Sequence, residues 1–132
     1  MDSRTRLAFL LLIAAQAVHS IEEYCLHLYD VLAPARAVSE ALGLDRQLGF
    51  AISNIALIVF GLWCYFARIR PGHRSARIYA WFWAVLEIAN ALAHGALAIA
   101  AGGYFPGLAT APLLLAAGLY LAWRLQPRPG SA

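Results

Sequence analysis

Four long apolar stretches decide what this sequence can fold into. They cover residues 7–28, 48–67, 78–100 and 105–125, and each is close to the roughly 20 residues that a helix needs to cross a bilayer. Hydrophobic residues make up 62% of the 132 residues and charged residues only 13%, against about 25% charged in an average soluble domain. One soluble core of this size cannot bury so much apolar surface. We therefore predict an all-α integral membrane protein, an up-down-up-down four-helix bundle.

The connections between these stretches indicate a single domain. Residues 1–126 are predicted to form one transmembrane unit, and the polar residues 127–132 a disordered tail. Only the first connection is long, and its residues 35–42 favour a short interfacial helix between the first two spanning helices. The later connections are short, so the helices that they join are expected to be antiparallel.

The first stretch also has features of a cleaved signal peptide, because Arg4 and Arg6 precede it and residues 15–17 resemble a cleavage site. We interpret it as a retained helix. Arginine placement then predicts the orientation: eight of the ten basic residues fall on the side of the two termini, and only Arg36 and Arg46 fall on the other. By the positive-inside rule we expect a multi-pass protein of the cell (inner, cytoplasmic) membrane with both termini cytoplasmic. A net charge of +3 carried at helix ends does not indicate nucleic-acid binding.

Ionisable residues inside the apolar stretches point to function. Glu22, Glu23 and Glu87 are three of the seven acidic residues, and His19 and His94 are two of the four histidines. A charged side chain at the centre of a membrane helix costs roughly 2.5–3.5 kcal/mol on insertion scales. Such residues generally face a protein interior or a wet cavity, so we take them as candidate site residues.

Spacing predicts that these residues converge. His19 and Glu23 are four residues apart on one helical face, with Glu22 on its flank. Glu87, Asn90 and His94 share an arc of about 60° on the third helix. The first and third helices are diagonal partners in an up-down bundle. We expect the two sets to meet in the outer half of the membrane.

Three roles fit such a cluster. His19, Glu23, Glu87 and His94 could ligate zinc, iron or manganese, which accept imidazole and carboxylate ligands. A metal-free site could instead transfer protons through catalytic groups, for which the candidates are Glu22, Glu23, Glu87 and Asn90. The same residues could also act structurally, by fixing helix register through buried hydrogen bonds.

The segment His19-Ser20-Ile21-Glu22-Glu23 reads H-x-x-E-E. With it, Asn90-x-x-x-His94 and the turn at residues 104–107 followed by Thr110 resemble the HXXEE-domain family of small prokaryotic membrane proteins. The resemblance covers nearly the whole chain. It implies polar positions at the three motif residues and at His94 with Glu87 or Asn90, and it implies no activity, because the function of the family is unknown.

Our leading hypothesis is a membrane-embedded enzyme with a metal-assisted or acid/base site for a lipophilic small molecule. The alternative is a non-catalytic membrane protein, either an ion or metal carrier or a subunit of a complex. The bilayer is the expected partner in both cases, and oligomerisation is compatible with both.

Overall fold

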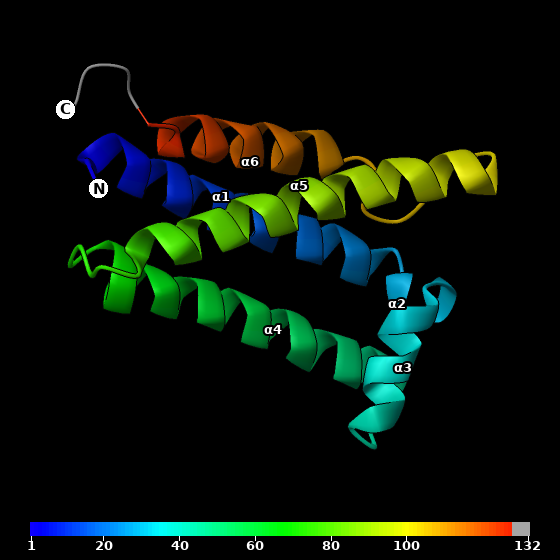
Figure 1. Ribbon diagram of the computed structural model, residues 1–132. Helices are drawn as coiled ribbons and strands as arrows, with labels where there is room; N and C mark the ends of the chain where they lie inside the picture. Colours follow the sequence, from blue (N-terminus) through cyan, green and yellow to red (C-terminus); the bar gives the residue numbers. More distant parts are fainter. Residues whose placement is uncertain (128–132) are drawn as a thin grey trace.

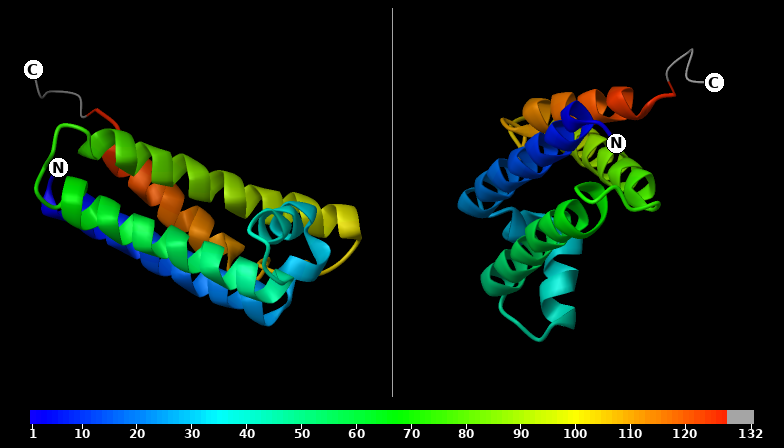
Figure 2. Two further views of the ribbon diagram at one scale, coloured as in Figure 1. Left: turned by 90° about the horizontal axis from the view of Figure 1, so that it is seen from below. Right: turned by 90° about the vertical axis from the view of Figure 1, so that its left-hand side faces the viewer.

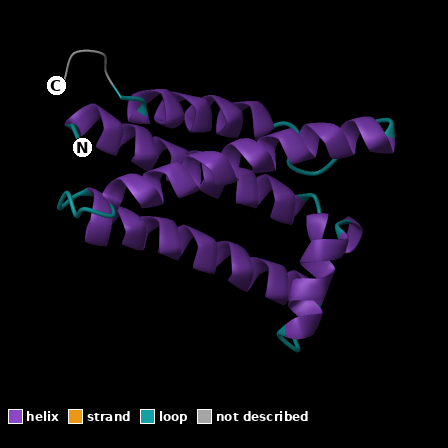
Figure 3. Ribbon diagram, in the orientation of Figure 1, coloured by secondary structure: helices purple, strands orange, loops and turns teal. Residues whose placement is uncertain are grey.

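The computed structural model describes residues 1–127, and this part of the chain is all-helical (Figure 3). This confirms the all-α prediction and the short helix between the first two long ones. Of the tail expected at residues 127–132, all but Pro127 lies outside the described residues. The elements are α1 (Ser3–Cys25), α2 (Leu28–Val31), α3 (Ala33–Ala41), α4 (Arg46–Cys64), the π-helix η1 (Tyr65–Ile69), α5 (Ala76–Ala101) and α6 (Ala111–Leu125).

Three helical segments are long and apolar enough to cross a membrane: α1, α4 continued through η1, and α5. The fourth stretch was expected to be helical over residues 105–125, but α6 has only 15 residues. At 1.5 Å per residue it spans about 22 Å, short of the roughly 30 Å of a hydrocarbon core. The helix begins later because Pro112 occupies its first turn, where a missing N–H costs nothing. Residues 105–110 form a turn instead.

Local signals explain the other helix ends. The Asp2 carboxylate accepts a hydrogen bond from the Thr5 amide and caps α1, and the Asp45 carboxylate caps α4 in the same way. The first helix was expected to reach residue 28 but ends at Cys25. His27 follows it with φ of 57°, a left-handed conformation that breaks the helix and turns the chain into α2.

The long helices alternate in direction. The chain runs away from its N-terminus in α1, returns in α4, runs out again in α5 and returns in α6 (Figure 1). Helix α6 packs against both α1 and α5, and α4 packs against α1. The α4 and α5 axes diverge towards the end occupied by α2 and α3, where they make little contact (Figures 1 and 2). The apolar core lies towards the other end and includes Phe9, Leu12, Trp83, Leu114 and Leu121.

Helix α3 lies close against the start of α4, because Gly49 leaves room for it. A Cβ atom at position 49 would lie 2.5 Å from Ser39 Oγ. Ser39 is fully buried, and its hydroxyl is within hydrogen-bond distance of the Ala35 and Arg46 carbonyl oxygens. This contact holds α3 across the end of the molecule where α4 and α5 diverge.

Candidate metal centre

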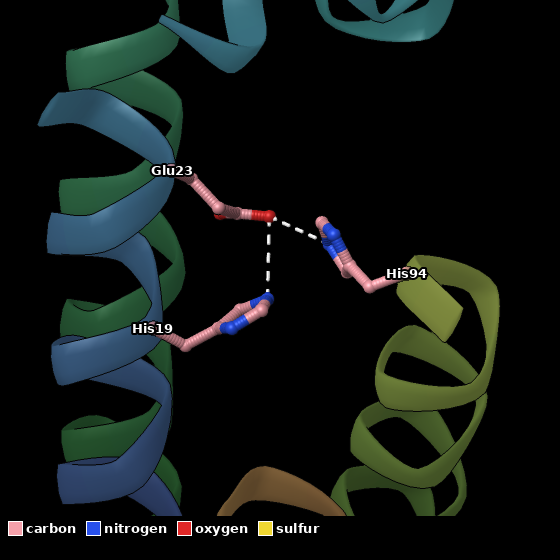
Figure 4. A group of neighbouring side chains, drawn as sticks. All are labelled: His19, Glu23 and His94. Atoms are coloured by element: carbon pink, nitrogen blue, oxygen red, sulfur yellow. Dashed lines mark ion pairs between the residues drawn. The ribbon is translucent and has the colours of Figure 1, made fainter. Parts of the chain in front are cut away.

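Three buried side chains from two helices converge on one point. His19 and Glu23 project from α1, and His94 projects from α5 (Figure 4). Glu23 Oε1 lies 3.3 Å from His19 Nε2 and 3.0 Å from His94 Nε2. His19 and Glu23 share a helical face because they are four residues apart. Helix α6 contacts both α1 and α5, which brings His94 opposite this face.

The three donor atoms lie close enough together to hold a metal ion. One candidate ligand atom from each residue lies within 4.8 Å of the others. Around a tetrahedral zinc ion with bonds of about 2.0–2.1 Å, neighbouring ligand atoms are about 3.3–3.4 Å apart. The two measured distances to Glu23 Oε1 are close to this value. Two imidazoles and one carboxylate are also a donor set of catalytic zinc sites, which keep the fourth position open.

Thr110 determines which nitrogen of His19 faces Glu23. The Thr110 hydroxyl donates to Glu22 Oε2 at 2.5 Å, so its proton is already used. Its oxygen lies 2.8 Å from His19 Nδ1 and must therefore accept the Nδ1 proton. In the neutral imidazole, Nε2 then presents a lone pair towards the Glu23 carboxylate. Within the described part of the chain this buried Nε2 has no hydrogen-bond partner. Two electron-rich atoms at 3.3 Å leave a position for a cation.

Glu22 is not part of the group formed by His19, Glu23 and His94. Its carboxylate accepts hydrogen bonds from the turn before α6, with the Thr110 amide at 2.8 Å, Ala109 at 3.1 Å and Gly107 at 3.2 Å. The Tyr104 hydroxyl donates to the same carboxylate. The first amides of a helix have no partner within the helix, and their positive end attracts anions. Glu22 therefore attaches α1 to the start of α6.

The turn before α6 also closes over both imidazoles. Gly107 has φ of 93°, and a Cβ atom there would lie 2.5 Å from the His94 ring and 2.9 Å from the His19 ring. The two rings meet edge to face, with centroids 4.7 Å apart. Spacing along the sequence did not identify this turn, because three of its contacts with Glu22 come from backbone amides, which carry no residue-type signal. Only the resemblance drew attention to it.

Comparison with known proteins agrees with the motif. A family model described as "Protein of unknown function with HXXEE motif" matches residues 10–121. The chain belongs to this family. No curated protein and no solved structure is significantly similar to it.

In this HXXEE-family chain the three motif residues have different contacts. His19 and Glu23 belong to the three-residue cluster with His94, which we call the His–Glu–His site. Glu22 binds the turn that carries Thr110, and Thr110 in turn contacts His19. The motif thus contains two candidate ligands, His19 and Glu23. Its third residue, Glu22, orients the His19 ring through the Thr110 hydroxyl. Outer partners of this kind set the tautomer and the ring direction of metal-binding histidines.

Two further predicted site residues lie outside this cluster. Glu87 is buried on α5, two turns before His94, and neither of its carboxylate oxygens has a hydrogen-bond partner among the described residues. Asn90 lies between them in sequence and lines a cavity that also reaches Glu23. Of the four ligands expected from the sequence, the structure brings together the candidate donor atoms of His19, Glu23 and His94, and Glu87 lies outside this group.

Proposed function

We propose that this HXXEE-family chain is an integral membrane enzyme that binds one divalent cation at the His–Glu–His site and acts on a lipophilic substrate. The observation that carries the proposal is the 2.8 Å contact of Thr110 Oγ1 with His19 Nδ1, which in the neutral ring leaves Nε2 unprotonated, 3.3 Å from Glu23 Oε1. A buried carboxylate flanked by two imidazoles is costly inside an apolar helix pair unless a cation compensates it.

The donor set suggests which ions fit and what they do. Two imidazole nitrogens and one carboxylate oxygen suit zinc, iron or manganese better than magnesium or calcium. When bound, such an ion supplies Lewis acidity towards a substrate oxygen or a water molecule. The chain itself holds the two imidazoles in place, contributes the negative charge of Glu23 and leaves one side of the site open to a cavity.

Exposed apolar faces support the placement in a membrane. Helices α4 and α5 expose more large apolar side chains than the surface of a water-soluble protein usually does, including Ile55, Val59, Val85, Leu92 and Ile99. We propose that residues 1–126 form one four-helix transmembrane bundle, in which the shorter α6 packs against α1 and α5. The arginine distribution then puts both termini in the cytoplasm and α3 at the opposite surface of the membrane.

A metal-free acid/base site is the second candidate, and one distance favours it. His94 Nε2 lies 3.0 Å from Glu23 Oε1, the usual length of an N–H···O hydrogen bond. In that case Glu23 and the imidazoles would move a proton on the lipophilic substrate, and no metal would be required.

Metal analysis of detergent-purified protein tests the proposal. After loading with zinc, iron(II) or manganese and dialysis, we expect one ion per chain in the wild type and loss of that ion in His19→Ala and His94→Ala. The matched control is His73→Ala, because His73 is an exposed histidine in the turn before α5. Less than one tenth of an ion per chain with all three metals, or equal retention in His19→Ala, overturns the metal proposal.

A further inference from the structure

A cavity lies directly beside the His–Glu–His site. It has a volume of about 270 Å³ and is formed by α1, α3, α4 and α5 with the chain that precedes α3. This is the end of the molecule where α4 and α5 diverge and α3 crosses it (Figure 1). Its walls are largely apolar, with Leu32, Val38 and Leu57 among them, and Glu23, Gln16 and Asn90 bring polar groups to it.

A chain of hydrogen bonds fixes the orientation of the Gln16 side chain. The Phe50 carbonyl can only accept, so the Asn54 amide group donates to it and Asn54 Oδ1 faces Ser20. The Ser20 hydroxyl therefore donates to Asn54 Oδ1, at 2.6 Å.

The next step in this chain determines what Gln16 offers to the cavity. Because the Ser20 proton is used, Ser20 Oγ accepts from Gln16 Nε2, at 3.0 Å. Gln16 Oε1 is thereby left as a free acceptor. It is buried and has no hydrogen-bond partner among the described residues, and Gln16 is only 2% exposed. Buried carbonyl oxygens in native proteins generally have a partner, so we infer that a donor group reaches Gln16 Oε1 when the cavity is filled.

The charge of the cavity limits what this ligand can be. No lining residue in the described part of the chain is an arginine or a histidine, so nothing there would pair with an anionic headgroup. A hydroxyl group suits the site, since it can donate to Gln16 Oε1 and accept from a carboxamide N–H such as that of Asn90. The volume is just below the roughly 300–1,000 Å³ of small-molecule pockets, which favours one small headgroup.

We propose that this cavity binds the headgroup of a neutral, single-chain lipid alcohol, with the lipid hydroxyl donating to Gln16 Oε1. The alkyl chain leaves between α4 and α5 towards the bilayer. Gln16 and Glu23 are two helical turns, about 10 Å, apart on the same face of α1, and both line the cavity. A ligand that fills the cavity therefore reaches the His–Glu–His site. As an assignment of substrate class, this inference rests on the proposed function, whereas lipid binding itself does not require the metal.

Paired probes test the role of the hydroxyl group. Radiolabelled 1-dodecanol and its methyl ether are compared in scintillation proximity binding to the metal-loaded full chain in detergent. The ether keeps the apolar chain and the oxygen but cannot donate. We expect the alcohol to bind about ten-fold more tightly, the contribution of about one buried hydrogen bond. Equal binding of the two probes overturns the inference.

Two variants connect this preference to the cavity. Gln16→Leu keeps the shape but removes the acceptor, so the preference for the alcohol should disappear. Gln47→Leu is the matched control, because Gln47 is exposed and outside the cavity, and it should keep the preference. Val38→Trp fills the cavity from the exposed helix α3 and should weaken binding of both probes. An unchanged preference in Gln16→Leu, or unchanged binding in Val38→Trp, contradicts the assignment.

The metal content of the same samples separates this inference from the proposed function. Gln16 is not a candidate ligand, so Gln16→Leu should retain one ion per chain. A preference for the alcohol that depends on Gln16 in a protein without bound metal supports the lipid site and overturns the metal centre. Bound metal without such a preference overturns only the lipid site.

Discussion

Thr110 Oγ1 lies 2.8 Å from His19 Nδ1, across an interval of 91 residues, and this contact orients a motif histidine from the start of another helix. The threonine is itself held by Glu22, so a proton-donating relay runs from His19 through Thr110 to the carboxylate. The direction of this relay is what leaves His19 Nε2 free for a cation.

Replacing Thr110 by valine should weaken metal binding without unfolding the protein. Valine has nearly the same shape but neither donates to Glu22 nor accepts from His19, so the imidazole loses its preferred tautomer. Loss of such an outer partner typically lowers metal affinity about 10–100-fold. Competition with a chromogenic chelator measures this. Thr110→Ser keeps the hydroxyl and should restore most of the affinity, and equal weakening in both variants would count against the relay.

Glu22→Gln should destabilise the contact between α1 and the α6 turn. The carboxylate accepts hydrogen bonds from three backbone amides and two hydroxyls. In glutamine an NH₂ group replaces one carboxylate oxygen, so its N–H donors would face these N–H and O–H donors. Hydrogen bonds to charged groups each contribute about 1.5–3 kcal/mol, so a loss of about 2 kcal/mol or more is expected. Thermal unfolding in detergent measures it. Glu40→Gln on exposed α3 is the control, and equal Tm values for the two variants would refute the expectation.

Gly107→Ala should disrupt the His–Glu–His site. An added Cβ atom would lie 2.5 Å from His94 Cε1 and Nδ1, and the backbone at φ of 93° disfavours any side chain. We expect the His94 ring to shift and metal stoichiometry to fall below half. Gly103→Ala provides the comparison in the same connection, since a Cβ atom there meets nothing within 4 Å. Retention of one ion per chain in both variants would show that the turn does not constrain the site.

The N-terminal cap should make stability depend on pH below about 4. Hydrogen bonds from the Thr5 hydroxyl and amide, together with Arg124, hold the pKa of Asp2 well below its usual value of 3.8. Because the folded-state pKa is lowered, this stabilisation is present above the unfolded pKa and is lost as pH falls through the folded one. The difference in Tm between wild type and Asp2→Asn should therefore shrink as the pH falls from 5 to 3, because this interval spans the unfolded-state pKa of 3.8. A constant difference would disprove the role of the cap.

Several features of the site could be predicted from the residues alone. A four-residue interval puts His19 and Glu23 on one face of any α-helix, and apolar length predicts that the helix is long. Glu87 was expected beside them because it shares an arc of α5 with His94. The two residues are seven positions apart along α5, however, and Glu87 is not among the three residues whose donor atoms lie together.

Glu22 and Glu23 mark the boundary between what sequence and structure decide. Hydropathy and helical period are local properties, so the sequence by itself determined that these adjacent carboxylates lie within a long apolar helix and point about 100° apart. It could not determine their partners. Packing of α6 against α1 decided that Glu22 binds the amides of the α6 turn while Glu23 meets His94. Backbone amides look alike at every residue, so only the tertiary structure shows which of them a carboxylate binds.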